Sequence, residues 1–473
     1  MSEASDNTGA AATCAGCAAR DRRVAELEAR VAGLEAKLGA AVRAGKRQAA
    51  PFSKGPPKAD PKPPGRKAGE DYGTHSRRAV PERIDERYEA ALPECCTDPG
   101  CPGRVRRTGV AQQYQAEITR RCVYRRFDVA VGECDACGRR VQGRHPLQAS
   151  DALGAAASQV GPDAQALAVL LNKGAGLSHG KVKAFFKDAF DLDLSRSASC
   201  RVMLRVAGRC EPAYASILAR LRASPWAVPD ETGWRICGQP AWMHVAVGGD
   251  VTAYLAHRRR GYEAAVGLLG EGYEGLLTHD GWKPYDRFVY ATHQTCLGHL
   301  LRRSGELIER AKGRKGAAAV FPRRVKSLLQ EALEVRDGRD AGGVTPQQAA
   351  AAAKALSGRM AELTASPRLN PDNERFAEHL SNQHNSLFTF LEFQGVDATN
   401  HKAEQAIRPA VVNRKVWGGN RTDPGARAQS VLMSVLRTAA QRGVDSLHFL
   451  SSTIKSRLGQ QPQLLAPTAP DTG

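Results

Sequence analysis

The sequence lacks any long hydrophobic run, since no stretch approaches the roughly 20 uninterrupted apolar residues that a helix needs to span a bilayer. The chain begins MSEASD, which has neither the basic start nor the apolar segment of a secretory signal. Acidic residues are in deficit, with 49 Asp and Glu against 68 Lys and Arg, a formal charge of +19. We therefore expect a cytoplasmic or nucleoid-associated bacterial protein with no membrane partner. Its expected ligand is a polyanion, with double-stranded DNA the leading candidate.

The sequence has twelve cysteines, and stable disulfides are rare in a reducing cytoplasm. Two pairs flank a stretch of alternating apolar residues, and their members are Cys96, Cys101, Cys134 and Cys137. Paired thiolates carried on β-hairpins satisfy tetrahedral Zn²⁺, so we predict a zinc-ribbon-like module over residues 90–148. Cys95 adjoins Cys96, and either thiol could provide the first ligand. Reduced free thiols are the alternative to a zinc site.

Composition and hydrophobic periodicity predict a multidomain α/β chain. Six apolar residues alternate spacings of three and four, which is typical of a coiled coil: Val24, Leu27, Val31, Leu34, Leu38 and Ala41. A solvent-exposed helix with incidental periodicity is the alternative. The predicted segments are, in order, a coiled coil (1–45), a basic Pro-rich linker (46–89), the zinc-ribbon-like module (90–148), a helical, helix-turn-helix-like DNA-binding domain (149–225), the first part of a mixed-sheet core (226–304), a helical insertion (305–395), the C-terminal helical part of the core (396–458) and a disordered tail (459–473).

Two short helices are predicted on either side of the polar turn DLDL, because Ser178 and Ser195 are good N-caps. We expect helices over residues 178–190, 195–207 and 211–223. The first two resemble a helix-turn-helix, whose groove-facing residues would be Arg196, Ser197, Ser199 and Arg201. A purely structural pair of helices is the alternative, since any two short helices have a similar pattern.

From Trp226 the hydrophobic pattern changes to the period of strands, with three β-runs separated by Gly-rich turns. A helix over Tyr262–Leu269 and an apolar strand ending at Asp280 follow. The run RFVYATHQTC then predicts another strand, and CLGHLLRRSGEL predicts a helix. This order predicts a mixed sheet flanked by helices.

Three acidic residues stand out by their positions. Asp230 follows the apolar stretch WAVP, Asp280 ends the strand LLTHD, and Glu404 lies near the start of a helix. Strand ends gather at one edge of such a sheet, which would point both aspartates into one cleft. Hard oxygen ligands hold two Mg²⁺ ions about 3.5–4 Å apart in sites that cleave and transfer phosphodiesters. The alternative is that these acids merely form turns.

Four runs of residues occur in a fixed order: PDETGW (229–234), THDGWKPYDRF (278–288), HQTCLGHLLRR (293–303), and TNHKAEQAIRP followed by NRKVWGGNRT. Together they resemble the insertion-sequence 66 family of transposases, and the resemblance covers nearly the whole chain. The family usually has Asp-Asn-Asn ahead of its final Glu, whereas this chain has Thr399, Asn400 and His401. Cys296 and His299 match a Cys-x-x-His pattern of several related groups. We expect this pair to pack a helix against the sheet, because two ligands do not make a zinc site.

The resemblance implies a DDE-type DNA transposase with a ribonuclease-H-like catalytic core and a helical insertion before the last acid. It makes Asp230, Asp280 and Glu404 the first, second and third catalytic acids, holding Mg²⁺ or Mn²⁺. Such an enzyme would bind the terminal inverted repeats of its element, then cleave and join DNA as a homodimer or higher oligomer. Accessory proteins of the same element are further expected partners. The alternatives are a DNA-binding regulator derived from a transposase without catalytic activity, and a nuclease that does not join DNA.

Basic residues surround Glu404, a pattern suited to a DNA backbone beside a metal site. They are Lys402, Arg408, Arg414, Lys415, Arg421 and Arg427. A solvated helix surface is the alternative. The zinc-ribbon-like module carries four further arginines that could bind transposon ends, namely Arg120, Arg121, Arg125 and Arg126.

Overall fold

The computed structural model describes the chain in several stretches and single positions. These are residues 23–35, 82, 84, 87, 93, 102, 104, 122–143, 145, 147, 148, 160–312, 317–393, 395–456 and 460–465. The chain divides into two compact units, Met1–Glu117 and Ile118–Gly473, and each is described by itself. Cys95, Cys96 and Cys101 lie outside the described residues, so the first half of the predicted zinc site is not described.

The first unit contains a helix over residues 23–35, within the predicted coiled coil. Four of the six apolar residues that suggested heptads are described, and all four are exposed in the single chain: Val24, Leu27, Val31 and Leu34. Leu38 and Ala41 lie outside the described residues. Helix formation in this stretch is therefore confirmed, and the coiled coil itself stays a prediction.

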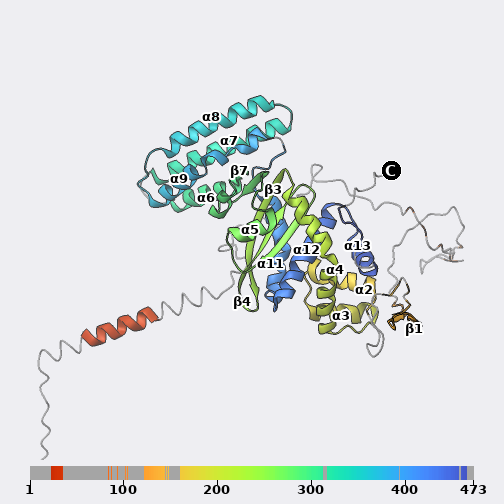
Figure 1. Cartoon of the computed structure of the whole chain (residues 1–473). Helices are drawn as coiled ribbons and strands as arrows, with labels where there is room; N and C mark the ends of the chain where they lie inside the picture. Colours follow the sequence, from red (N-terminus) through yellow and green to blue (C-terminus); the bar gives the residue numbers. More distant parts are fainter. Residues whose placement is uncertain are drawn as a thin grey trace, which may run out of the picture. The chain divides into compact units, whose positions relative to one another are not determined.

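The second unit is built around a five-stranded sheet with the strand order β5-β4-β3-β6-β7 (Figure 1). Its strands are β3 (Trp226–Ile236), β4 (Gln239–Val247), β5 (Thr252–His257), β6 (Leu276–His279) and β7 (Thr292–Thr295). The first three strands are antiparallel neighbours, whereas β6 is parallel to β3 and β7 is parallel to β6. The predicted mixed sheet is thus confirmed.

Helices cover both faces of this sheet and extend beyond it. They are α2 (Pro162–Val169), the π-helical turn η2 (Leu170–Gly174), α3 (His179–Phe190), α4 (Arg196–Arg222), α5 (Tyr262–Leu269), α6 (Leu297–Arg310), α7 (Val320–Asp340), α8 (Pro346–Thr364), α9 (Pro371–Asn382), α10 (Thr389–Glu392), α11 (His401–Trp417), α12 (Asp423–Gln441) and α13 (Ser446–Lys455). The short 3-10 segments are η3 (Lys283–Arg287), η4 (Ala317–Ala319) and η5 (His384–Ser386). The helix predicted over Tyr262–Leu269 is confirmed as α5.

The two faces of β3 contact different helices, because successive strand residues point to opposite sides. Val228 and Val245 of the sheet share a core with Ala403 and Ala406 of α11. Alanine at these helix positions lets the backbone of α11 approach the strands closely. On the other face, Ala227 belongs to the core that includes α5. A residue at an even-numbered position of β3 near Val228 therefore faces α11.

Hydroxyl groups of α12 accept hydrogen bonds from backbone N–H groups at one edge of the sheet. Strand β5 lies at this edge, where unpaired backbone N–H groups would otherwise be exposed to a foreign strand. Three hydroxyls of α12 accept hydrogen bonds from alternate β5 amides: Thr438 from Thr252 at 3.1 Å, Ser434 from Tyr254 at 2.8 Å and Ser430 from Ala256 at 2.9 Å. The i, i+4 spacing of these hydroxyls matches the period of a helix laid along a strand.

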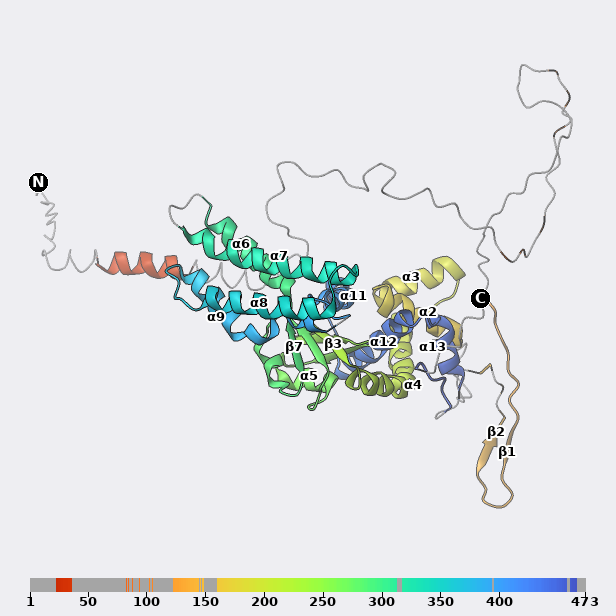
Figure 2. The same cartoon turned by 90° about the horizontal axis from the view of Figure 1, so that it is seen from above.

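The segment between β7 and α11 forms a helical bundle with a core of its own. In this bundle α6 packs on α7, α7 on α8 and α8 on α9 (Figures 1 and 2). Leu329 of α7, Met360 of α8 and Phe376 of α9 are all completely buried in its core. The bundle is tied to the sheet domain at its start, where the N–H of Leu297 donates to the carbonyl of Ala398 at 2.8 Å. The predicted all-helical character of this segment is confirmed.

The helices before the sheet begin where the sequence predicts. The side chains of Ser178 and Ser195 cap α3 and α4, each accepting a hydrogen bond from a backbone N–H three residues on. The predicted break after residue 207 is wrong, because α4 continues through Pro212 as one helix of 27 residues. Its buried apolar positions run on without interruption to Leu221, so continuous packing outweighs the lost hydrogen bond at the proline. No described helix is both long and apolar enough to cross a membrane.

Candidate active site

Asp230 lies in β3, and Asp280 directly follows β6, the parallel neighbour of β3. The register of β3 and β6 pairs residues 50 positions apart, such as Ala227 with Leu277, and the same offset joins Asp230 to Asp280. Adjacent strands are about 4.8 Å apart, so the two carboxylates start from neighbouring backbone. Asp280 directly follows β6, as expected. Asp230 does not end its strand, because the polar ETG segment pairs with β4 instead of turning, and β3 continues to Ile236.

A tight turn after β6 holds Asp280. The N–H of Trp282 donates to Asp280 Oδ1 at 2.9 Å. Gly281 between them has φ of 84°, a left-handed conformation that costs glycine little. A Cβ at Gly281 would come within 2.9 Å of the His379 ring, so α9 of the helical bundle lies directly against this turn. The glycine of the THDGW motif is therefore required both by the backbone and by the packing.

Glu404 lies in the first turn of α11, and its N–H donates to the carbonyl of Asn400 at 3.0 Å. The side chain of Asn400 does not cap α11, because its Oδ1 accepts instead from the Cys296 thiol at 3.1 Å. His299 has its Nδ1 3.3 Å from the Cys296 sulfur and its Nε2 3.8 Å from Glu404 Oε1. The Cys-x-x-His pair is thus built into the packing of α6 against the start of α11, and His299 contacts the acid itself.

The charges of Asp280 and Glu404 both act on the carboxyl group of Asp230. The pKa of Asp230 is raised to about 7, chiefly by burial, and the charges of Asp280 and Glu404 add to the shift, as does that of Glu231. The N–H of Glu231 donates to Asp230 Oδ1 at 2.8 Å and acts in the opposite direction. Residues far apart in the sequence are therefore brought within electrostatic reach on the α11 side of the sheet.

A divalent ion fits the chemistry of these side chains. The like charges that raise the pKa of Asp230 are those that a dication would offset, and carboxylate oxygens are the ligands that Mg²⁺ prefers. Among the described residues, no three His, Cys, Asp or Glu side chains are grouped tightly enough to hold one ion together. The spread of the acids over β3, the β6 turn and α11 suits ions held by one or two carboxylates each, with the remaining positions open to substrate oxygens.

Glu231 points to the opposite face from Asp230 and lies in a network that the sequence did not reveal. Its side chain is 4% exposed and accepts from Arg260 at 2.7 Å and from the Tyr285 hydroxyl at 3.1 Å. The Arg260 guanidinium lies between two rings, 4.9 Å from Trp242 and 4.5 Å from Trp282. The network links β3, β4, the segment after β5 and the turn after Asp280.

The basic residues of α11 make different contacts. Arg414 is half-buried and donates to Thr232 Oγ1 at 3.1 Å and to the carbonyl of Gly233, which joins α11 to β3. Lys402 pairs with Asp397 at 2.8 Å, and its amine lies 4.5 Å from the ring of a β3 tryptophan. Arg414 therefore has a structural partner in the chain, whereas its predicted contact with DNA is untested.

Four other arginines of the predicted DNA-binding set are exposed: Arg196, Arg201, Arg408 and Arg421. Lys415 is half-buried. Ser199, which we expected to face a groove, is fully buried, and its Oγ lies 2.9 Å from His179 Nδ1. Ser199 therefore joins α4 to α3 and is not available to DNA, because the apolar face of α4 includes it.

Cys134 and Cys137 lie at the tip of a small hairpin between β1 (Val131–Glu133) and β2 (Arg140–Gln142). The pKa of the Cys134 thiol is lowered, because the N–H groups of Cys137 and Ala136 hydrogen-bond to its sulfur. A thiolate stabilised in this way is suited to binding a metal ion. Both cysteines are free thiols.

The described part of the second unit is a mixed α/β fold, with a five-stranded mixed sheet between helices. A family model described as Transposase IS66 family matches residues 157–428. This match covers more than half of the chain, and the chain belongs to the IS66 family of transposases. No curated protein matches the chain.

Proposed function

We propose that this transposase is a DDE enzyme with a ribonuclease-H-like core that cleaves and joins DNA at the ends of its own element. The observation that carries the proposal is that the charges of Asp280 and Glu404 both raise the pKa of Asp230. Asp280 lies in the turn after β6, and Glu404 lies in α11, 124 positions further along the chain. The strand order supports it, since two parallel strands extend an antiparallel hairpin sheet. A regulator without catalysis would have no need for three mutually repelling acids.

Asp230, Asp280 and Glu404 would hold the divalent ions, Mg²⁺ or Mn²⁺, which when bound supply an activated nucleophile and a stabilised leaving oxygen. The protein contributes the positions of these acids. The parallel pairing of β3 with β6 supports placing the two aspartates near each other, and the Arg414 hydrogen bond to Thr232 supports the position of α11 on β3. The site can then serve both hydrolysis by water and strand transfer by a 3′-hydroxyl, because only the attacking oxygen differs.

Outside the core, we propose that Cys134 and Cys137 bind Zn²⁺ together with Cys96, or Cys95, and Cys101. The hairpin that carries the described pair, and the lowered pKa of Cys134, support this. The exposed Arg196 and Arg201 at the start of α4 would contact DNA as well. Joining two ends at once favours a homodimer or higher oligomer, with partner proteins of the same element as additional subunits.

The decisive experiment is strand transfer by the purified full chain with Mg²⁺, using pre-nicked duplexes of the element's terminal sequence and a target plasmid. Asp280→Asn and Glu404→Gln should each lower joined product by at least about 10²-fold, as expected for loss of a central electrostatic contact. Glu392→Gln, an exposed acid on α10, is the matched control and should join normally. Joining that persists unchanged in Asp280→Asn excludes the mechanism, and cleavage without joining by the wild type would indicate a nuclease.

A further inference from the structure

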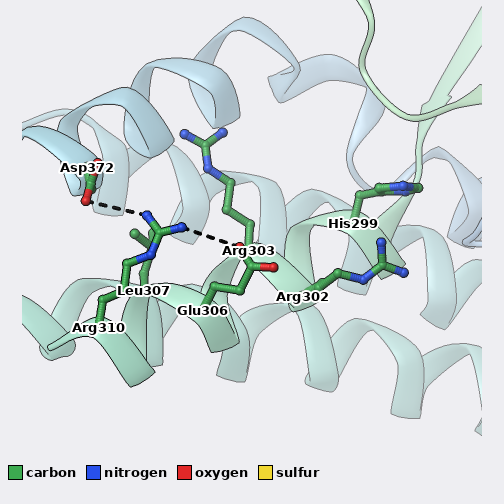
Figure 3. A pocket seen from close by; sticks show the side chains of 7 residues that line it. All are labelled: His299, Arg302, Arg303, Glu306, Leu307, Arg310 and Asp372. Carbon is green, nitrogen blue, oxygen red and sulfur yellow. Dashed lines mark ion pairs between the residues drawn. The ribbon is translucent and has the colours of Figure 1, made fainter. Parts of the chain in front are cut away.

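A cavity of about 300 Å³ lies between α6 and α9, outside the three acids (Figure 3). Its lining includes one apolar side chain, Leu307, and is otherwise polar and rich in guanidinium groups. Small-molecule pockets are mostly apolar, so this lining suits a charged ligand. The positive groups come chiefly from one face of α6, where Arg302, Arg303 and Arg310 lie.

The three arginines differ in how far their charges are already neutralised. Arg310 lies 3.8 Å from Glu306 and 3.7 Å from Asp372, so both carboxylates of the lining are committed to it, as the dashed lines of Figure 3 mark. Arg302 is exposed and has no carboxylate within ion-pair distance in the part of the chain that the structure describes. The cavity therefore has an uncompensated cation.

Arg303 is the second cation of the cavity that a bound anion would contact. Its guanidinium is stacked 4.8 Å from the Phe376 ring, which fixes its direction. Burial lowers the pKa of Arg303, and the charges of Arg375 and Arg310 lower it further, while Asp372 and Glu306 act in the opposite direction. A desolvated guanidinium among like charges is stabilised by an anion that accepts several hydrogen bonds, and phosphate oxygens accept in the forked geometry that arginine offers.

The cavity adjoins the candidate active site. His299 lines the cavity, and the same imidazole lies 3.8 Å from Glu404. On α9, His379 lies against the turn of Asp280 and is close enough to Arg303 for that charge to lower its pKa. His299 and His379 of the helical bundle thus lie between the two acids and the cavity.

We propose that this cavity binds a backbone phosphate of the DNA strand next to the scissile phosphate, with Arg302 and Arg303 as its ligands. The proposal rests on the proposed function, which it extends to the role of the helical bundle. Successive phosphates of one strand are spaced by about 3.4 Å along the helix axis, so a strand that has its scissile phosphate at the acids and runs along α6 would bring another phosphate to the cavity. Holding that phosphate would fix the strand on one side of the reacting bond.

The test measures binding without chemistry. A duplex of the element's terminal sequence is titrated with the full chain in EDTA at several salt concentrations, and binding is followed by fluorescence anisotropy. Arg302→Ala is the main variant, because the side chain is exposed and its loss leaves the core intact. It should weaken binding roughly 10-fold and reduce the salt slope by about 1. Arg302→Lys should restore most of the slope. Lys354→Ala, an exposed cation on α8 that does not line the cavity, should change neither quantity.

A second arm identifies the phosphate. Single methylphosphonates, which remove one backbone charge, are placed in turn at the positions flanking the cleavage point. One of them should weaken binding by the wild type and have no further effect on Arg302→Ala. Equal effects on both proteins at every position overturn the proposal. So does Arg302-dependent binding of a free nucleoside monophosphate with no such coupling to the DNA backbone.

The outcomes separate this proposal from the one on which it rests. If the wild type joins DNA normally but shows no coupling between Arg302 and any phosphate, the cavity proposal alone is wrong. If coupling is found but Asp280→Asn still joins DNA, the phosphate site stands and the catalytic mechanism is wrong. Thermal melting of every variant confirms that changes in binding do not arise from unfolding.

Discussion

Asp230 and Glu231 are adjacent in β3, yet they belong to opposite faces of the sheet and to different networks. Asp230 faces α11, where the charges of the other two acids act on it, while Glu231 points to the other face and is bound by Arg260 and Tyr285, although its charge also reaches Asp230. Because Tyr285 belongs to the turn that follows Asp280, the Glu231 network fixes the backbone at both aspartates from behind. The acids that repel one another on one face are thus held in place by compensated charge on the other.

Breaking this network should lower the free energy of unfolding, because Glu231 is nearly fully buried and would lose its partners. Glu231→Ala should leave Arg260 without its carboxylate, and Arg260→Ala should leave a buried anion; because the Arg260 side of the pair is partly exposed, we expect a loss of about 1–3 kcal/mol. Urea unfolding followed by circular dichroism measures the change. Glu263→Gln is the control, since its pair with Arg259 is exposed on both sides and such pairs contribute about 0–1 kcal/mol. If Glu263→Gln lowered the free energy of unfolding as much as Glu231→Ala and Arg260→Ala do, the stabilising role of the Glu231 network would be contradicted.

Two arginines of α11 should separate packing from DNA binding. Arg414→Ala removes the hydrogen bonds to Thr232 and Gly233 and should lower the free energy of unfolding by about 1.5–3 kcal/mol. Arg408→Ala, on the same helix but exposed, should leave stability within about 0.5 kcal/mol and weaken DNA binding. Urea unfolding and anisotropy titrations on both variants check this. A stability loss at Arg408 with none at Arg414 would reverse the assignment.

Much of the architecture follows from local sequence pattern. The serine caps of α3 and α4, the period-two runs of β3 to β5 and the helix α5 are all recognisable because each depends on neighbours within a few residues. The continuation of α4 through Pro212 is not, because it depends on apolar contacts with other elements. For the same reason the sequence predicts a turn at the ETG segment, because its strand structure depends on pairing with β4.

The candidate site shows the same division. The DG turn that holds Asp280 is a local signal, and the resemblance directed attention to Glu404. The partner of Glu231 is Arg260, which stands in a run of three arginines that are equivalent in the sequence. Only the fold distinguishes it, because the rings of Trp242 and Trp282 come from separate elements. Long-range pairing of side chains leaves no periodic trace in the chain.

The raised pKa of Asp230 predicts a conflict between stability and function. A carboxyl group whose folded pKa is about 7, above its unfolded value near 3.8, binds its proton more tightly in the native state. Native stability therefore falls as pH rises from about 4 to about 7, and the cost is fully present above that range. Asp230→Asn should raise the melting temperature at pH 8 and lose this advantage near pH 4.

Divalent metal should offset the loss of stability that ionised Asp230 causes. Mg²⁺ offsets the repulsion among the acids, so it should raise the melting temperature of the wild type at pH 8 through binding to the native state. Asp230→Asn should show a much smaller rise, and Glu392→Gln should respond as the wild type does. An equal response to Mg²⁺ in all three proteins would place the metal elsewhere. Differential scanning calorimetry with and without Mg²⁺ makes the comparison.

Zinc should depend on the cysteines of the hairpin and not on other exposed thiols. Cys134→Ser and Cys137→Ser should each reduce bound zinc from about one ion per chain to a trace, since a structural site needs four ligands. Cys200→Ser is the matched control, because Cys200 is an exposed free thiol on α4 with no cysteine partner nearby in the sequence. Elemental analysis of the purified proteins gives the metal content directly. Cys96→Ser and Cys95→Ser then decide the first ligand, because only the variant at the true ligand loses zinc. Full zinc content in Cys134→Ser would show that Cys134 is not a zinc ligand.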